Sequence, residues 1–156
     1  MVDLVTHWQR FLHDSSKAAP DISHPEQVVH KFNSAWIVGD VEAAIQLVAE
    51  DCVYALHISE ELLPFGGETR GRANIKSALQ MMRHQFDYLQ YRPGHPTVDG
   101  SKVQNQVEFM YRHRKSGEVL TGTFRIVFQV KDGLLVRGDE YHDRAMVETF
   151  MRLFAG

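Results

Sequence analysis

Three charged residues, Glu108, Arg125 and Glu140, fall in successive stretches in which apolar and polar residues alternate, the pattern of strands. The stretches are separated by Ser116-Gly117 and Asp132-Gly133, dipeptides typical of two-residue hairpin loops. Residues that flank such a loop pair directly, so counting outward places Glu108 opposite Arg125, and Arg125 opposite Glu140. The sequence therefore predicts a row of acid, base and acid across a three-stranded antiparallel meander.

This row could perform acid–base chemistry if it lined a pocket. One Arg cannot neutralise two carboxylates in a low-dielectric site, so one Glu would keep its proton and act as general acid while the other acts as base. On a solvated surface the same row is an ion-pair ladder, each pair contributing less than ~1 kcal/mol. The same count places Met110, Thr123 and His142 side by side on the same face, one step further along the strands. His142 suits proton transfer because an imidazole has an unperturbed pKa near neutrality. Both interpretations stay open.

The opposite face of the meander is predicted to be apolar, and therefore buried. Its members are Val103, Val107, Phe109, Phe124, Ile126, Phe128, Val130, Leu135 and Tyr141, with Arg137 and Asp139 as polar exceptions. This surface and the terminal helices offer more apolar area than three helices can cover, so we expect a homodimer.

Helices that could cover this face are predicted before and after the meander. Ser23 and Glu26 bracket a capping box, after which Phe32 and Trp36 fall on one apolar face. Further helices are predicted to start at Asp40, at Gly71 and at Asp143. Residues 1–24 are predicted to form a short helical arm and linker, and residues 25–156 a single domain.

A strand from Cys52 to Ile58 is predicted to place Tyr54 and Leu56 toward the interior, because side chains alternate with a period of two. His57 follows near a glycine-rich loop, where it could reach a pocket mouth or lie on the surface. The single cysteine, Cys52, starts an apolar run and is interpreted as a small buried residue rather than a nucleophile.

Composition narrows the classes of function. A net charge of -3 over 156 residues, with both signs mixed, gives neither a basic stripe for nucleic acid nor a polybasic membrane patch. No Cys/His spacing indicates a metal site, and neither a signal peptide nor a membrane span is apparent in the sequence. We therefore expect a cytoplasmic protein that needs no metal or other cofactor.

Four motifs in order resemble the SnoaL-like and ketosteroid-isomerase-like branch of the nuclear transport factor 2 superfamily. They are Ala35-Trp36-Ile37-Val38-Gly39-Asp40, Ala49-Glu50-Asp51-Cys52-Val53-Tyr54, Gly67-Glu68-Thr69-Arg70-Gly71-Arg72 and Asp139-Glu140-Tyr141-His142-Asp143. The resemblance implies an α+β fold in which a cone-shaped, curved, mostly antiparallel sheet wraps around about three helices and leaves an apolar pocket. It also implies dimerisation through the sheet.

The resemblance does not fix the chemistry, because this fold hosts several reactions. Phe32 and Leu56 stand where ketosteroid isomerase has its hydrogen-bonding tyrosine and catalytic aspartate, so that mechanism is rejected. The limonene-epoxide-hydrolase pattern retains an acid as Glu140 but has Gln106 in place of its arginine. The His and Asp pair of polyketide cyclases could be supplied by His142 with Asp139 or Glu140.

Three functions follow as hypotheses. The first is a cofactor-independent isomerase, cyclase, hydratase or hydrolase acting on an apolar carbonyl or epoxide compound. The second is a ligand-binding module without turnover, and the third a dimeric scaffold with a filled pocket. The predicted catalytic residues are Glu108, Arg125, Glu140 and His142, and the predicted ligand-binding residues are Phe32, Trp36, Tyr54, Leu56, His57 and Met110.

Overall fold

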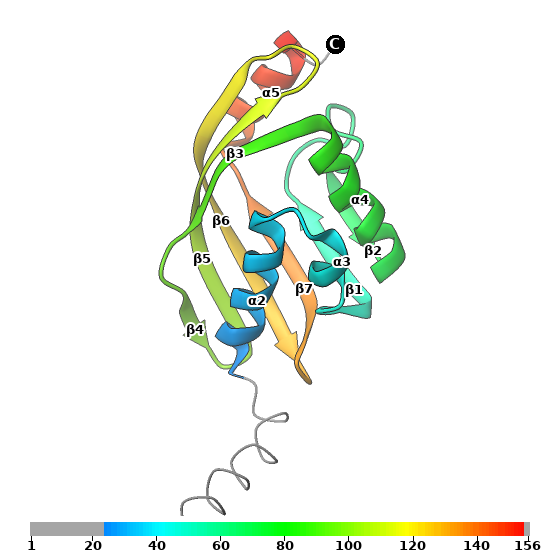
Figure 1. The fold of residues 1–156 in the computed structure, drawn as a ribbon, viewed down its shortest axis with the longest axis vertical. Helices are drawn as coiled ribbons and strands as arrows, with labels where there is room; N and C mark the ends of the chain where they lie inside the picture. The colour runs from blue at the N-terminus through cyan, green and yellow to red at the C-terminus, as the bar shows by residue number, and fades with distance from the viewer. Residues whose placement is uncertain (1–23, 155–156) are drawn as a thin grey trace, which may run out of the picture.

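The computed structural model describes residues 24–154, which form one curved, open, seven-stranded sheet with helices packed on it (Figure 1). The helices are α2 (Pro25–Ile37), α3 (Val41–Ile45), α4 (Arg72–Gln85) and α5 (Arg144–Phe154). The strands are β1 (Val48–Leu56), β2 (Gly67–Arg70), β3 (Phe86–Pro93), β4 (Thr97–Asp99), β5 (Lys102–His113), β6 (Val119–Lys131) and β7 (Leu134–Tyr141). The predicted arm, residues 1–24, lies outside the described residues except for His24.

The strands follow the order β2-β1-β7-β6-β5-β3, with β4 paired to β5 beside β3. Every pairing is antiparallel except that of β1 with β7. The α+β fold class with a curved, mostly antiparallel sheet is therefore confirmed. Strand β2 was not predicted, because Gly67-Glu68-Thr69-Arg70 shows no alternation of apolar and polar side chains.

Helices α2 and α4 lie across one face of the sheet (Figure 1). Phe32 of α2 packs edge-on against Phe128 of β6, with 5.5 Å between ring centroids. Of the predicted apolar face, all but Tyr141 are buried inside the chain: Val103, Val107, Phe109, Phe124, Ile126, Phe128, Val130 and Leu135. Because this face is already covered within the chain, it does not supply the dimer interface expected from it, and the homodimer stays a prediction.

The helix starts depend on local signals that the sequence carries. Gly39 ends the corner after α2 with a φ of 78°, and the side chain of Asp40 accepts a hydrogen bond from the Ala43 N–H at 3.0 Å, capping α3. Asp143 accepts from the Met146 N–H at 3.2 Å at the start of α5. The predicted cap of α2 was wrong, because its N-cap residue is His24 and makes no side-chain cap.

The register of the first hairpin differs from the prediction. The β5–β6 loop holds five residues rather than two, because the hydroxyl of Ser116 lies 2.8 Å from Nδ1 of His113 and accepts from the Glu118 N–H at 3.2 Å. These contacts stabilise a wider turn. Glu108 is consequently opposite Thr123, and Arg125 is opposite Gln106.

The second hairpin has the predicted two-residue loop, in which Asp132 and Gly133 both have positive φ. Beyond the loop, however, Val130 pairs with Leu135 whereas Gln129 pairs with Arg137, so Val136 of β7 is an extra, bulged residue. A shift of one residue turns every later side chain to the other face of the sheet. Arg125 therefore pairs with Tyr141, not with Glu140.

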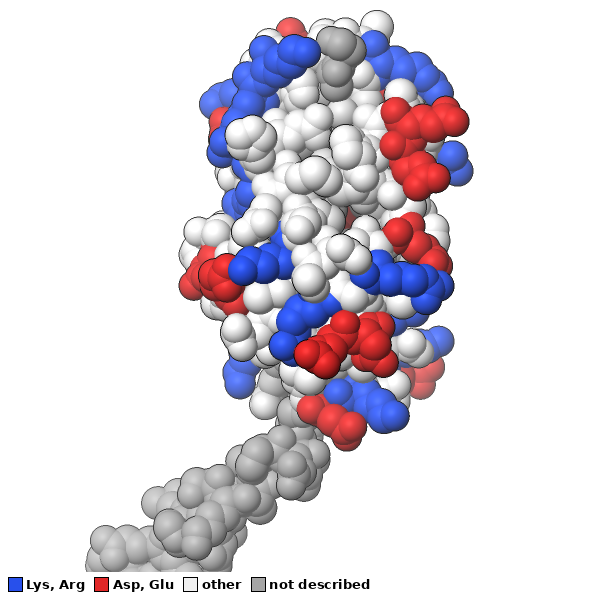
Figure 2. All heavy atoms as spheres, turned by 90° about the vertical axis from the view of Figure 1, so that its right-hand side faces the viewer, with Lys and Arg blue, Asp and Glu red and all other residues white. Residues whose placement is uncertain are grey.

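Charged side chains of both signs are interspersed over the face seen in Figure 2, with an uncharged area in its upper half. Among residues 24–154, no helix is long and apolar enough to cross a membrane.

Candidate functional site

The predicted row of Glu108, Arg125 and Glu140 does not form. Glu108 and Arg125 are exposed on the outer face of the sheet, whereas Glu140 is buried on the inner face. The guanidinium of Arg125 lies 4.6 Å over the Tyr141 ring rather than beside a carboxylate. The alignment of Met110 with Thr123 and His142 was also wrong, since Met110 is opposite Thr121. The wider first hairpin and the bulge at Val136 explain both corrections.

Glu140 and His142 instead line an apolar cavity of about 50 Å³ between the sheet, α4, α5 and the segment after β1. The other lining residues are Leu56, Ile58, Leu63, Phe65, Met82, Phe86, Tyr88, Phe109, Tyr111, Leu120 and Val147. The cavity is thus an aromatic and aliphatic enclosure that contains one carboxyl group and one imidazole. This composition is typical of small-molecule sites, which combine apolar walls with few convergent polar groups.

The Glu140 carboxyl group is bonded through both of its oxygens. Tyr54 of β1 donates its hydroxyl hydrogen to Oε2, and Nε2 of His142 lies 3.0 Å from Oε1. The side chains of Glu140 and His142 are only 11% and 8% exposed. The imidazole of His142 is stacked on Phe124, with ring centroids 4.3 Å apart. These contacts fix both groups in position.

This arrangement determines which nitrogen of His142 is available. An ionised carboxylate accepts hydrogen bonds only, so Nε2 must carry the hydrogen that it shares with Glu140. A neutral imidazole then has its lone pair on Nδ1. Nδ1 is buried and has no hydrogen-bond partner among the described residues. The carboxylate–imidazole pair therefore leaves Nδ1 of His142 buried and without a partner, while the carboxylate orients the ring as it does for a catalytic histidine.

Tyr54 reaches Glu140 because the neighbouring position on β7 is glycine. A Cβ at Gly138 would come within 2.9 Å of the Tyr54 ring and 3.1 Å of the Phe128 ring. Burial and the charge of Glu140 raise the pKa of Tyr54 well above its ordinary value, so this hydroxyl remains a donor.

Two further tyrosines belong to the cavity wall. Tyr88 of β3 and Tyr111 of β5 are paired across the strands, and their rings are stacked with centroids 4.2 Å apart. Burial, followed by nearby charges that include Glu140, raises the pKa of both tyrosines. The guanidinium of Arg83 lies 4.2 Å over the Tyr88 ring and 4.5 Å over Trp36. The cavity wall thus contains two tyrosines as well as an imidazole.

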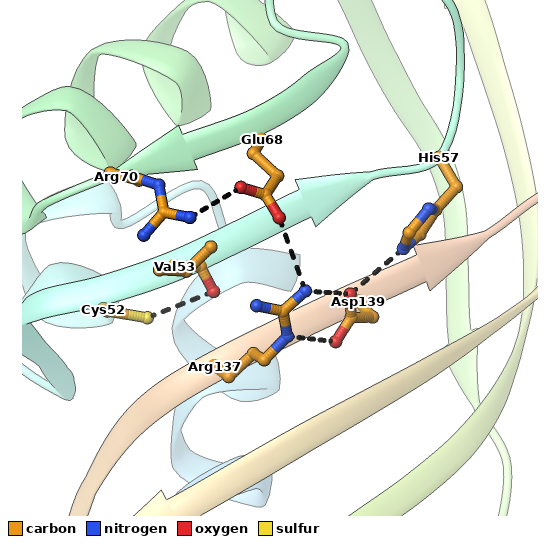
Figure 3. A network of polar contacts seen from close by, with 7 residues as sticks. All are labelled: Cys52, Val53, His57, Glu68, Arg70, Arg137 and Asp139. Atoms are coloured by element: carbon orange, nitrogen blue, oxygen red, sulfur yellow. Dashed lines mark hydrogen bonds and ion pairs between the residues drawn. The ribbon is translucent and has the colours of Figure 1, made fainter.

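A second histidine–carboxylate pair, His57 and Asp139, lies on the outer face of the sheet (Figure 3). Nε2 of His57 lies 3.0 Å from Asp139, which also accepts two hydrogen bonds from Arg137 at 2.8 and 3.0 Å. Glu68 joins Arg137 at 3.7 Å and Arg70 at 3.0 Å. The His57 ring, 43% exposed, is stacked on Tyr141 at 4.4 Å. This network is a solvated surface cluster.

The predicted ligand-binding residues are divided between the cavity, the core and the outer surface cluster. Leu56 lines the cavity, and Tyr54 supports it through Glu140. Phe32 and Trp36 are core residues of α2 that do not line the cavity. His57 belongs to the outer cluster, and Met110 does not line the cavity either.

Sequence reasoning missed the pair Tyr88 and Tyr111, together with Phe109 and Leu120 from the β5–β6 hairpin. Tyr111 continues the inward alternation of Val107 and Phe109. That alternation could have identified Tyr111, but only the curvature of the sheet brings β3 and β5 over Glu140. Residues 24–154 contain no group of three or more His, Cys, Asp or Glu that could hold a metal ion.

Solved structures with the same fold share little sequence with this chain. A nuclear transport factor 2-like protein from Burkholderia xenovorans is 20% identical with a TM-score of 0.71, over 80% of this chain and 93% of that one. TerC, co-crystallised with polyporic acid, is 16% identical with a TM-score of 0.72, and the match covers 82% of this chain and 98% of TerC. A protein with a ketosteroid-isomerase-like fold from Catenulispora acidiphila, in complex with trimethylamine, is 14% identical with a TM-score of 0.66. The match covers 77% of this chain and 88% of that one.

A search of the curated proteins found no significant match. A family model of the SnoaL-like domain, in contrast, matches residues 29–138, well over half of the chain. That range runs from α2 into β7 and ends just before Glu140 and His142. The chain belongs to the SnoaL-like domain family.

Proposed function

We propose that the cavity binds a small, apolar carbonyl or epoxide compound and that His142, oriented by Glu140, moves a proton on it without a cofactor. The observation that carries this proposal is the free, buried Nδ1 of His142, whose opposite nitrogen is held by Glu140 at 3.0 Å. A positioned base of this kind contributes about 10²–10⁴-fold to a proton transfer.

For a carbonyl compound, the proton leaves the carbon next to the carbonyl group and binds to Nδ1 of His142. The electron pair of the broken C–H bond moves into an enolate, whose oxygen needs hydrogen-bond donors. Tyr88 and Tyr111 line the same cavity and supply hydroxyl groups of raised pKa. Return of the proton at another carbon gives an isomerisation, and attack of the enolate on a second carbonyl gives a cyclisation.

The size of the cavity restricts the substrate. About 50 Å³ is well below the roughly 300–1,000 Å³ of typical ligand pockets, so a larger compound must displace part of the wall. The segment that contributes Ile58, Leu63 and Phe65 is the candidate for this movement. Its Ser59 N–H donates to Glu148 of α5 at 3.1 Å, so the segment and the helix are expected to move together.

Deuterium exchange tests the proposal directly. The chain is incubated in D₂O with a panel of small ketones and lactones, and loss of the proton next to the carbonyl is followed by NMR. We expect exchange that His142→Gln abolishes and that the matched outer variant His57→Gln retains. The proposed base is contradicted if the wild type catalyses no exchange, or if His142→Gln exchanges the proton as fast as the wild type.

A second candidate function is ligand binding without turnover, and the lining of the cavity gives it a specific ligand. Aromatic rings of Phe86, Tyr88, Phe109 and Tyr111 surround a carboxylate, the combination that binds methylated ammonium groups. The structure from Catenulispora acidiphila contains trimethylamine, a small methylated amine. Calorimetric binding of trimethylammonium that Glu140→Gln abolishes, without exchange on any ketone, favours this function.

We also propose that the protein is a homodimer, as the family resemblance implies. The inner sheet face is occupied by helices, so the outer face with Glu108 and Arg125 is the surface left for pairing. Sedimentation velocity at micromolar concentration tests this, and a monomer there contradicts it.

A further inference from the structure

A second enclosed histidine, His113, lies where the β5–β6 hairpin, β3 and α5 meet, at the top of Figure 1. His113 is the last residue of β5 and is 1% exposed, although the residues that follow it in the turn are exposed. It pairs with Phe86, the first residue of β3, and the two ring centroids are 5.4 Å apart. The Phe150 ring of α5 stands edge-on to it at 6.2 Å. His113 is therefore in contact with three elements at once.

Hydrogen bonds in the hairpin turn determine which nitrogen of His113 carries its hydrogen. The backbone N–H of Ser116 donates to Nδ1 at 3.3 Å, so Nδ1 must be an acceptor. The Ser116 hydroxyl lies 2.8 Å from the same nitrogen and accepts from the Glu118 N–H at 3.2 Å, so its own hydrogen points to Nδ1. An imidazole whose Nδ1 accepts is neutral and has its hydrogen on Nε2. The turn is thus built on the neutral form of His113.

Protonation of His113 is incompatible with this turn. An imidazolium donates from both nitrogens, so its Nδ1–H would face the backbone N–H of Ser116, which can only donate. A positive charge would also be buried beside two phenyl rings, which is costly without a partner. Burial, and then the nearby charge of Lys115, accordingly lower the pKa of His113 below its ordinary value.

The surrounding elements offer no carboxylate that compensates this charge. Within residues 24–154, His113 forms no ion pair, and Asp87 of β3 is held by Arg114 at 2.7 Å. Glu148 of α5 is held by two arginines of its own helix. At the end of α4, His84 is exposed. The charged side chains of the hairpin near the turn are also exposed: Arg112, Arg114, Lys115 and Glu118.

The elements that His113 joins also form the wall of the apolar cavity. They contribute four of its lining residues: Phe86, Tyr111, Leu120 and Val147. Helix α5 in turn holds the segment after β1, because Glu148 accepts a hydrogen bond from the Ser59 N–H at 3.1 Å. Loss of packing around His113 would therefore loosen several walls of the cavity together.

We propose that His113 is a pH-dependent latch, which holds the β5–β6 turn, β3 and α5 together when neutral and opens the cavity wall when protonated at mildly acidic pH. The direction follows from linkage, because the fold favours the neutral form. The stabilisation is complete above the unfolded pKa of ~6.5 and is lost as the pH falls through that value toward the lower folded pKa. The latch is independent of proton transfer at His142.

The first test needs no substitution. The Cε1–H signal of His113, assigned through its backbone, is followed by NMR in the wild-type chain from about pH 8 to about pH 5. We expect its titration midpoint to lie below ~6.5, the value of an unperturbed histidine. A midpoint at or above that value overturns the proposal.

The second test locates the release by amide hydrogen exchange at about pH 7 and about pH 5, expressed as protection factors to remove the intrinsic effect of pH. His113→Asn keeps an acceptor oxygen for the Ser116 N–H but cannot be protonated, and His84→Gln is the matched exposed control. In the wild type and in His84→Gln, protection of α5 and the β5–β6 turn should fall by about tenfold on acidification, whereas that of α2 should not.

In His113→Asn, protection of α5 and the turn should be nearly independent of pH. A fall as large as in the wild type, or a wild type whose protection falls equally in α2, contradicts the latch. If His113→Asn fails to fold, the titration of the wild-type chain still decides.

Discussion

Strand β7 carries two carboxylates, Asp139 and Glu140, on opposite faces of the sheet, and each lies 3.0 Å from a histidine ring nitrogen. The outer pair, His57 and Asp139, is part of an ion-pair network open to solvent, and Arg137 occupies the carboxylate. The inner pair, His142 and Glu140, is enclosed by apolar side chains, and a tyrosine hydroxyl holds the carboxylate. A 3.0 Å distance between imidazole and carboxylate is therefore not enough to make a catalytic pair. A free imidazole nitrogen next to an apolar cavity distinguishes the inner one.

The largest expected effect is on proton transfer. Glu140→Gln leaves a neutral amide beside His142, which no longer favours the tautomer with a free Nδ1. We expect the exchange rate of a ketone substrate to fall by about 10²–10⁴-fold. The matched outer substitution, Asp139→Asn, should leave the rate unchanged. If both variants lose activity equally, the proposed difference between the two faces is wrong.

The second prediction concerns the tyrosines on the inner side. Four of the five tyrosines, Tyr54, Tyr88, Tyr91 and Tyr111, have pKa values raised by burial and then by neighbouring charges that include Glu140. At about pH 11, above the ordinary tyrosine pKa of ~10, the folded chain should therefore develop much less tyrosinate than the denatured chain. Absorbance at 295 nm measures this, and full ionisation before unfolding would show that the inner side is solvated.

The third prediction compares two tyrosine hydroxyls across the sheet. Tyr54→Phe removes the donor to Oε2 of Glu140 and leaves a buried carboxylate oxygen unpaired. The free energy of unfolding should fall by about 1–3 kcal/mol. Tyr141→Phe, at a position that is 39% exposed on the outer face, should change it little. Urea unfolding of both variants provides the measurement, and equal losses would contradict the asymmetry.

The smallest effect is expected from the outer pair. Burial by itself would raise the pKa of Asp139, but hydrogen bonds from Arg137 and His57 outweigh it and lower the pKa below its ordinary value. The ionised carboxylate therefore stabilises the fold above the unfolded pKa of ~3.9, and this contribution is lost as the pH falls through the lower folded pKa.

Asp139→Asn should accordingly reduce the free energy of unfolding at pH 7 by about 1 kcal/mol or less, because the network is near the surface. The difference from wild type should narrow as the pH falls below ~3.9. Unfolding curves at several pH values test this, and a difference that grows toward acid pH would contradict the assigned direction.

Much of the fold could be predicted because its signals are local. Apolar residues at helical spacing located α2, α4 and α5, and Asp40 and Asp143 marked helix starts through their own side-chain caps. The Asp132-Gly133 turn was also read correctly from residues that tolerate positive φ. Strand β2 was not predicted because Gly67-Glu68-Thr69-Arg70 has no apolar alternation of its own and forms a strand only beside β1.

The candidate site was predicted only in part, for a different reason. Glu140, His142, Tyr54 and Leu56 were selected, and the structure brings them together. Glu108 and Arg125 were selected by counting register from two turns, and both lie on the outer face. The count failed because hairpin register depends on loop length and on bulges, neither of which leaves a reliable mark in residue type.

The sequence by itself therefore determined most of the element types, most of the apolar inner face and a set of residues that could transfer protons. Only the tertiary structure decided which of them meet. One bulged residue, Val136, turns Glu140 inward and Asp139 outward, because side chains on a strand alternate between faces. The curvature of the sheet then brings the tyrosines of β3 and β5 to the same cavity as Glu140, since contacts between distant strands depend on the whole sheet rather than on any one segment.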